Sequence, residues 1–196
     1  MRVLRMEAHR RVAFLIAEKS MRRRFVGAFA RSAGAVPVAR ALDSTKAGAG
    51  TVYLANPVND PTLIRGVGTQ FEKEAEVGGL LVLPTINGTA ANAEILEIHG
   101  PEELRLKKEF KGADAMKQLT GRSDITDLGK LINGGGSGEK DTAEGFKGSI
   151  FKTAPRVDQT KVYDAVFQRL EAGGCVGIFP EGGSHDRTEL LPLKGK

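Results

Sequence analysis

The chain has 196 residues, of which 40% are apolar, and a formal net charge of +5 from 29 Lys and Arg against 24 Asp and Glu. This apolar fraction suits one compact domain, or one domain with a large insertion, and excludes wholesale disorder. The single Cys excludes an intramolecular disulfide framework, and the apolar runs are far shorter than the roughly 20 residues of a membrane-spanning helix.

Two short apolar runs flank a helical pattern near the amino end. Residues 12–17 predict a buried strand, and residues 35–39 predict a second strand in which Pro37 indicates a sheet edge or an irregularity. Between them, Ser20 is suited to cap a helix that ends at Gly34. The apolar positions of that helix are Phe25, Val26, Phe29, Ala30 and Ala33. Such a strand–helix–strand unit is typical of α/β proteins.

The positive charge is concentrated in this amino-terminal region. Residues 1–40 hold ten basic side chains against two acidic ones, so they carry +8 and the remaining 156 residues carry −3. A basic end favours an anionic partner, such as a phosphorylated small molecule, nucleic acid or an anionic membrane face. A solvated helix face is the alternative. A mitochondrial transit peptide is disfavoured because Glu7 and Glu18 interrupt the basic run.

Residues 46–155 have a different character. Short β-type runs at 51–55, 79–83 and 93–98 alternate with turn signals such as Asn87-Gly88. The polar, Gly-rich residues 126–149 predict a flexible loop. We interpret 46–155 as a β-rich insertion in an α/β core.

The carboxyl end repeats the strand and helix pattern. Asp158 is suited to cap a helix over 159–172 that stops at Gly173, and residues 175–179 predict a buried strand. The helix places Val162, Ala165, Val166 and Leu170 on one face. Cys175 is expected to be a small core residue, because no His lies at a spacing that supports a Cys–His pair.

Several motifs fail on inspection. The Gly-rich residues 134–140 lack the Gly-Lys-Ser/Thr ending of a phosphate loop. Ser184-His185-Asp186 are consecutive residues, which do not normally form a hydrolase relay. Asn87 fits a glycosylation sequon but also a hairpin turn, and the scattered His and Cys give no metal-site spacing.

One group of residues remains as a candidate functional site. The strand at 175–179 runs into the Gly-rich polar segment 180–187, and Arg40 follows the strand at 35–39. In α/β folds, functional groups gather at the carboxyl ends of strands, so these two places form a candidate site. Glu181 could orient a hydroxyl there, and the planar fork of Arg40 could hold a phosphate. A structural turn explains 180–187 equally well.

These residues carry a family resemblance. The segment IFPEGGSHDRTELLPLK at 178–194 resembles the third signature block of the glycerol-phosphate acyltransferase superfamily, especially its fungal glycerol-3-phosphate/dihydroxyacetone-phosphate branch. The segment GAVPVAR at 34–40 is similar to the second block. The resemblance implies an α/β fold that is a partial acyltransferase core, formed by residues 1–45 and 156–196, around the insertion at 46–155.

The resemblance also implies a function and a site. The function is transfer of an acyl group from acyl-CoA, a co-substrate, to the sn-1 hydroxyl of glycerol 3-phosphate or dihydroxyacetone phosphate in phospholipid biosynthesis. No other cofactor, metal or nucleic acid is expected, and the full-length protein is expected at the cytosolic face of the endoplasmic reticulum membrane. The implied substrate-binding residues are Arg40 at the acceptor phosphate, with Gly34, Glu181, Gly182, Gly183 and, more weakly, Lys19.

The chain departs from the family in one respect. The family's first block, His and Asp separated by four residues, supplies the general base, and none of the three His here has an Asp at that spacing. Losing a general base costs about 10²- to 10⁴-fold in rate, so we assign no catalytic residue and expect an internal fragment that is inactive alone. The alternative is a non-catalytic basic module that binds anionic lipid or nucleic acid, and a hydrolase built on Ser184 is a distant third.

Overall fold

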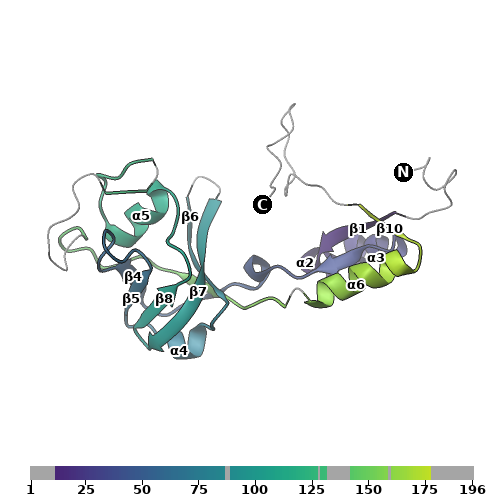
Figure 1. Ribbon diagram of the computed structural model, residues 1–196, viewed down its shortest axis with the longest axis horizontal. Helices are drawn as coiled ribbons and strands as arrows, with labels where there is room; N and C mark the ends of the chain where they lie inside the picture. Colours follow the sequence, from purple (N-terminus) through teal and green to yellow (C-terminus); the bar gives the residue numbers. More distant parts are fainter. Residues whose placement is uncertain (1–11, 87–88, 128, 132–141, 159, 178–196) are drawn as a thin grey trace. The chain divides into compact units, whose positions relative to one another are not determined.

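The structure, a computed structural model, describes residues 12–86, 89–127, 129–131, 142–158 and 160–177. The chain divides into two compact units, which we call unit 1 (residues 1–40 and 158–196) and unit 2 (residues 41–157) (Figure 1). The predicted insertion at 46–155 lies inside unit 2. The chain as a whole contains both helices and strands, which is compatible with the predicted α/β class.

Unit 1 is built on a three-stranded parallel sheet. Its strands are β1 (Val12–Ala17), β2 (Val36–Val38) and β10 (Cys175–Gly177), in the order β10-β1-β2. The bounds of β1 are those predicted from its apolar run. Pro37 lies in β2 at the edge of this sheet, as predicted, because an edge position tolerates a residue without a backbone N–H.

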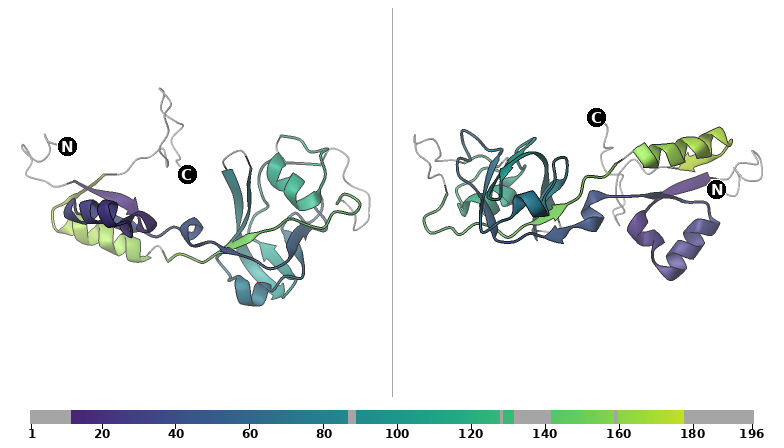
Figure 2. Two further views of the ribbon diagram at one scale, coloured as in Figure 1. Left: turned by 180° about the vertical axis from the view of Figure 1, so that it is seen from behind. Right: turned by 90° about the horizontal axis from the view of Figure 1, so that it is seen from below.

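Three helices accompany this sheet: α2 (Glu18–Met21), α3 (Arg24–Ser32) and α6 (Thr160–Glu171) (Figure 2). The prediction that Ser20 caps the first helix is wrong, because Ser20 lies inside α2 and Arg23 is the N-cap of α3. The Asp158 cap is confirmed, since its Oδ1 accepts a hydrogen bond of 2.9 Å from the backbone N–H of Thr160. Gly173 follows α6 with a φ of +73°, as expected of a helix stop.

Of the predicted apolar face of α3, Ala30 is buried as expected, but the two phenylalanines are exposed, which corrects the sequence-based expectation. Phe25 is 91% exposed and Phe29 is 76% exposed, whereas Gly27 and Ala30 are the buried residues of this helix. Gly27 lets α3 pack closely against the end of α2, because a Cβ at this position would lie 1.9 Å from the carbonyl oxygen of Met21. In the part of unit 1 that the structure describes, the sheet has three strands and gives α3 little surface against which to bury both aromatic side chains.

The carboxyl-terminal elements of unit 1 are also less buried than predicted. Leu170 of α6 is exposed, and Cys175 is half-buried, so it is not a fully enclosed core residue. Ala13, Ala30 and Val36 are the buried apolar residues among those that the structure describes in unit 1.

Unit 2 contains a seven-stranded antiparallel sheet in the order β3-β9-β6-β7-β8-β5-β4. Its strands are β3 (Lys46–Ala47), β4 (Thr51–Leu54), β5 (Leu63–Val67), β6 (Leu80–Ile86), β7 (Thr89–Gly100), β8 (Glu103–Leu106) and β9 (Lys152–Ala154). Its helices are the 3₁₀ helix η1 (Ala41–Ser44), α4 (Phe71–Glu74) and α5 (Ala113–Thr120). An antiparallel bridge between Val52 and Ser149 connects β4, at one end of the strand order, to the segment that precedes β9.

The β-type runs predicted in this unit correspond to β4, β6 and β7. The β6–β7 pairing extends to Ile86 opposite Thr89, which fits the predicted hairpin, while residues 87 and 88 lie outside the described part. Of the predicted loop at 126–149, residues 132–141 are likewise outside it, and its flexibility stays a prediction.

A single apolar cluster forms the core of unit 2. Strands β4, β5 and β8 alternate buried and less buried residues, which is the pattern of strands with one face on a core. Phe71 of α4 packs edge to face against Phe151, with ring centroids 5.6 Å apart. Leu104 and Ile64 are fully buried on the paired strands β8 and β5. Unit 2 therefore has an apolar core of its own.

A bidentate ion pair joins β8 to the turn before β5. Arg105 donates through Nη1 and Nη2 to the two carboxylate oxygens of Asp60, at 3.0 Å each, and Thr62 Oγ1 donates to the same carboxylate at 2.8 Å. The hydrogen bonds from Arg105 are the main reason why the pKa of Asp60 lies below its ordinary value.

This ion pair predicts how the stability of unit 2 depends on pH. Since the folded-state pKa of Asp60 is lowered, its stabilising effect is present above the unfolded pKa of about 3.9 and is lost as the pH falls through the folded-state pKa. Asp60→Asn is therefore expected to flatten the acid side of the curve of melting temperature against pH. Thermal unfolding between about pH 5 and 2 checks this, with the exposed carboxylate variant Asp127→Asn as control. An unchanged acid limb in Asp60→Asn would contradict the prediction.

Candidate functional site

The parallel strands of unit 1 bring two basic residues to one sheet edge. The last paired residues of β1 and β2 are Ala17 and Val38, which are in register. Lys19 and Arg40 each follow two residues after this pair, so both lie just beyond the carboxyl ends of adjacent strands. Neighbouring strands are about 4.8 Å apart, and this edge is where α/β folds place ligand-binding groups. We call the place the carboxyl edge of unit 1.

The charges around Lys19 leave it open to an anion. Glu18, its acidic neighbour in α2, forms an ion pair of 2.9 Å with Arg22. Lys19 itself is exposed and makes no ion pair with the residues that the structure describes. Arg40 is exposed as well. The side chains of Lys19 and Arg40 are thus both at the surface at the carboxyl edge, and the guanidinium of Arg40 has the planar fork that holds phosphate oxygens in pairs.

Gly34 does not lie at this edge. It precedes β2, whereas Arg40 follows it, so the strand separates the two ends of the motif that contains both residues. Gly34 has a φ of +69°, and its carbonyl oxygen accepts a hydrogen bond of 2.8 Å from Nη2 of Arg169 in α6. The structure thus gives Gly34 a conformational role in the turn from α3 to β2 and does not bring it to Lys19 and Arg40.

This geometry predicts the effect of Gly34→Ala. A Cβ at Gly34 would lie 2.1 Å from Nη2 of Arg169, and a left-handed conformation costs a non-glycine residue about 1–2 kcal/mol. We expect lower protection of the α6 amides in hydrogen exchange. Gly173→Ala is the matched control, because Gly173 has a φ of +73° and a Cβ added there would meet no described atom within 4 Å. Equal losses in both variants would contradict a role for the Arg169 contact.

The remaining predicted site residues, Glu181, Gly182 and Gly183, lie outside the described residues, as do Ser184-His185-Asp186. Strand β10 leads toward them and runs parallel to β1. Across the part of the chain that the structure describes, no group of His, Cys, Asp or Glu could hold a metal ion. No helix in that same part is long and apolar enough to cross a membrane.

Sequence reasoning missed Arg169. Arg169 lies in the last turn of α6, so the sequence by itself predicts only a local interaction with the carbonyl groups at the end of that helix. The bond that it makes instead reaches Gly34, 135 residues away in the chain, and only the folded arrangement of α6 beside β2 reveals it.

Comparisons with known proteins identify relatives among fungal acyltransferases. The chain is 39% identical over 191 residues to an uncharacterized acyltransferase of Schizosaccharomyces pombe, covering 97% of this chain and 24% of that protein. It is 38% and 34% identical to glycerol-3-phosphate O-acyltransferases 1 and 2 of Saccharomyces cerevisiae, covering 95% and 92% of this chain but 21% and 22% of theirs. No family model matches the chain, and neither does any solved structure.

These comparisons confirm the resemblance seen in the motif blocks. Nearly the whole chain is similar to a segment of proteins that are named acyltransferases, two of which are named glycerol-3-phosphate O-acyltransferase. It spans about a fifth to a quarter of the length of these relatives.

Proposed function

We propose that this chain contributes to acyl transfer from acyl-CoA to the sn-1 hydroxyl of glycerol 3-phosphate, or of dihydroxyacetone phosphate, in phospholipid biosynthesis. The observation that carries the proposal is its similarity, over 92–95% of its residues, to two proteins named glycerol-3-phosphate O-acyltransferase. We extend the proposal to the whole protein as an enzyme at the endoplasmic reticulum membrane that needs no metal and no cofactor besides its acyl-CoA substrate.

Within this function, the carboxyl edge of unit 1 is the proposed place for the acceptor phosphate. A phosphomonoester carries close to two negative charges at neutral pH, so it favours a site with more than one cation. Arg40 would hold two phosphate oxygens with its fork, and Lys19 would add a point charge from the neighbouring strand end. Both residues are exposed at one edge, which supports this assignment.

The Gly-rich block at 181–183 is proposed to complete the acceptor site. Strand β10 is parallel to β1, with Gly177 opposite Phe14, so the chain leaves β10 in the direction in which β1 and β2 end. This direction supports a place for Glu181 at the same edge, where its carboxylate would accept a hydrogen bond from an acceptor hydroxyl. Gly182 and Gly183 would let the backbone approach the ligand closely.

The chemistry explains why the chain alone is proposed to be inactive. The acceptor hydroxyl oxygen attacks the thioester carbonyl, the new C–O bond replaces the C–S bond, and CoA leaves as the thiol after taking up the proton. A general base must accept the hydroxyl proton in this step. The His–Asp block that does so in the family does not occur in the 196 residues, so other parts of the protein would supply the base.

A segment exchange tests the function. Residues 1–196 would replace the homologous segment of the yeast glycerol-3-phosphate O-acyltransferase 1, and the chimera would be assayed with acyl-CoA and glycerol 3-phosphate. We expect turnover by the chimera and none above background by the chain alone. Robust turnover by the chain alone would refute its inactivity. A folded chimera without turnover, together with no binding of glycerol 3-phosphate by the chain, would overturn the function.

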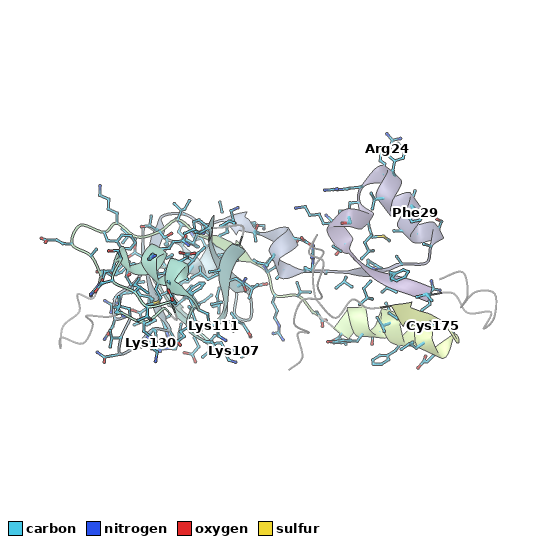
Figure 3. The ribbon with its side chains drawn as sticks, turned by 90° about the horizontal axis from the view of Figure 1, so that it is seen from above. Arg24, Phe29, Lys107, Lys111, Lys130 and Cys175 are labelled. Atoms are coloured by element: carbon cyan, nitrogen blue, oxygen red, sulfur yellow. The ribbon has the colours of Figure 1, made fainter. Side chains whose placement is uncertain are left out.

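One observation favours a second candidate, a basic module that binds an anionic lipid surface. The exposed Phe25 and Phe29 lie one turn apart on α3, and Arg24 and Arg31 are exposed on the same helix. Figure 3 shows Arg24 and Phe29 on this helix. An aromatic pair among arginines is suited to the headgroup region of an anionic bilayer. Under this candidate the chain binds phosphatidylserine vesicles in a salt-dependent manner, and Phe25→Ala with Phe29→Ala abolishes the binding. No sedimentation with such vesicles would eliminate it.

A further inference from the structure

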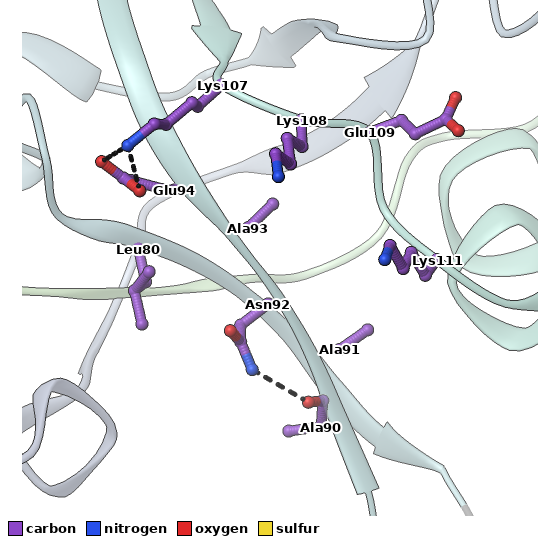
Figure 4. Close-up of a pocket in the computed structure, with 10 residues that line it drawn as sticks. All are labelled: Leu80, Ala90, Ala91, Asn92, Ala93, Glu94, Lys107, Lys108, Glu109 and Lys111. Atoms are coloured by element: carbon purple, nitrogen blue, oxygen red, sulfur yellow. Dashed lines mark hydrogen bonds and ion pairs between the residues drawn. The ribbon is translucent and has the colours of Figure 1, made fainter. Parts of the chain in front are cut away.

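Unit 2 contains a groove that the acceptor site does not use. It has a volume of about 500 Å³ and lies between β7 and the segment that follows β8 (Figure 4). One side of the groove is lined by residues 90–94 of β7 and by Leu80 of β6. The segment after β8 contributes Lys107, Lys108, Glu109 and Lys111. Pockets for small ligands commonly have volumes of about 300–1,000 Å³, so the groove is large enough for a substrate.

The groove exists because two segments separate where a strand pairing ends. The β7–β8 pairing begins at Ile95 opposite Leu106, and the backbone N–H of Lys107 still donates to the carbonyl oxygen of Glu94 at 2.9 Å. Beyond this bond, no described strand pairs with β7 on that side. The strand carries the small side chains Ala91 and Ala93 there, which leaves the space open.

The charges of the groove are unevenly neutralised. Lys107 Nζ lies 2.9 Å from both carboxylate oxygens of Glu94, so this lysine has its counter-ion within the protein. Lys108 and Lys111 are exposed and make no ion pair with the described residues. Figure 4 shows their side chains turned toward β7, while the carboxylate of Glu109 points away from the strand. The groove thus offers two ammonium groups to a ligand.

We propose that this groove binds the phosphorylated adenosine part of acyl-CoA. The inference rests on the proposed function, in which acyl-CoA is the substrate that carries a nucleotide. Lys108 and Lys111 would contact its phosphate groups, and the flat base would lie against the alanine side chains of β7 beside the amide of Asn92. The proposal concerns unit 2 by itself and assigns a donor-binding role to the insertion.

An extended acidic peptide, added as a strand along β7, is the other ligand that lysines at an open strand edge could suit. The Asn92 side chain argues against it. Its Nδ2 donates to the carbonyl oxygen of Ala90 at 3.4 Å, so a strand added beside Ala90 would have to share or displace this contact. We therefore favour the nucleotide.

Isothermal titration of the full chain with CoA tests the proposal without any need for catalysis. Lys108→Ala and Lys111→Ala are each expected to weaken CoA binding about tenfold, the loss typical of one charge-assisted hydrogen bond. Lys73→Ala is the matched control, because Lys73 is an exposed lysine of α4 outside the groove. This variant is expected to bind CoA with the same affinity as the parent chain. Dephospho-CoA is expected to bind more weakly than CoA, and pantetheine not at all.

Several results would overturn the proposal. One is the absence of CoA binding, and another is an unchanged affinity in a variant that carries both Lys108→Ala and Lys111→Ala. The others are inorganic phosphate binding as tightly as CoA and binding of an acidic peptide in place of CoA. A parallel titration with glycerol 3-phosphate separates the two proposals. Lost CoA binding with retained, Arg40-dependent glycerol 3-phosphate binding would refute the groove alone. Retained CoA binding without any glycerol 3-phosphate binding would count against the proposed acceptor site instead.

Discussion

Arg40→Ala is expected to lower acyl transfer about a hundredfold in the yeast chimera that carries this chain, the order of effect seen when a preorganised electrostatic contact at a reacting substrate is removed. The physical reason is that the fork of Arg40 at the end of β2 is proposed to fix the acceptor phosphate and, through it, the position of the attacking hydroxyl. Initial rates at several glycerol 3-phosphate concentrations measure the effect.

Two further variants make this prediction specific. Arg40→Lys retains the positive charge but not the planar fork, so it is expected to recover only part of the rate. Arg24→Ala removes an exposed arginine of the same unit from α3, away from the carboxyl edge, and is expected to leave the rate near that of the parent chimera. Equal losses for Arg24→Ala and Arg40→Ala would show a dependence on overall charge and would contradict a phosphate site at Arg40.

Leu104→Ala is expected to lower the free energy of unfolding of unit 2 by about 3 kcal/mol, which is a large part of the 5–15 kcal/mol typical of a domain. Leu104 is 0% exposed and lies on β8 between its partner strands β5 and β7, where a cavity cannot easily collapse. Urea unfolding followed through resolved NMR signals of unit 2 provides the measurement. Leu96→Ala, at a 42% exposed leucine of β7, is the control and is expected to change the free energy by less than about 0.5 kcal/mol. Comparable losses in both variants would contradict the assigned core.

The local elements that the sequence predicts well are those with a strong, uninterrupted signal. The apolar run of β1 has no polar interruption, and Asp158 precedes its helix at the position that a capping residue takes. The position of Lys19 and Arg40 at one sheet edge could also be predicted from the sequence, because a strand–helix–strand unit with parallel strands brings the carboxyl ends of its strands together. Strands β3 and β9 were missed, since two or three residues are too few to show a periodicity.

Other features depend on surface area and on contacts that no local pattern encodes. The spacing of Phe25 and Phe29 predicts burial, but burial requires a surface to pack against, and the described sheet of unit 1 has only three strands. The position of Gly34 could have been predicted from the motif at 34–40, because β2 lies within this motif and therefore separates Gly34 from Arg40 at its two ends. The groove of unit 2 follows from where the β7–β8 pairing stops, which the sequence does not specify.

The central claim is that the carboxyl edge of unit 1 binds the acceptor phosphate. Titration of the isotope-labelled chain with glycerol 3-phosphate, followed by the NMR signals of backbone amides, tests it most directly. The account predicts saturable shifts that are largest around Lys19 and Arg40, include the amides of Glu181, Gly182 and Gly183, and disappear in Arg40→Ala. Shifts that avoid Lys19 and Arg40, or that persist unchanged in Arg40→Ala, would contradict it.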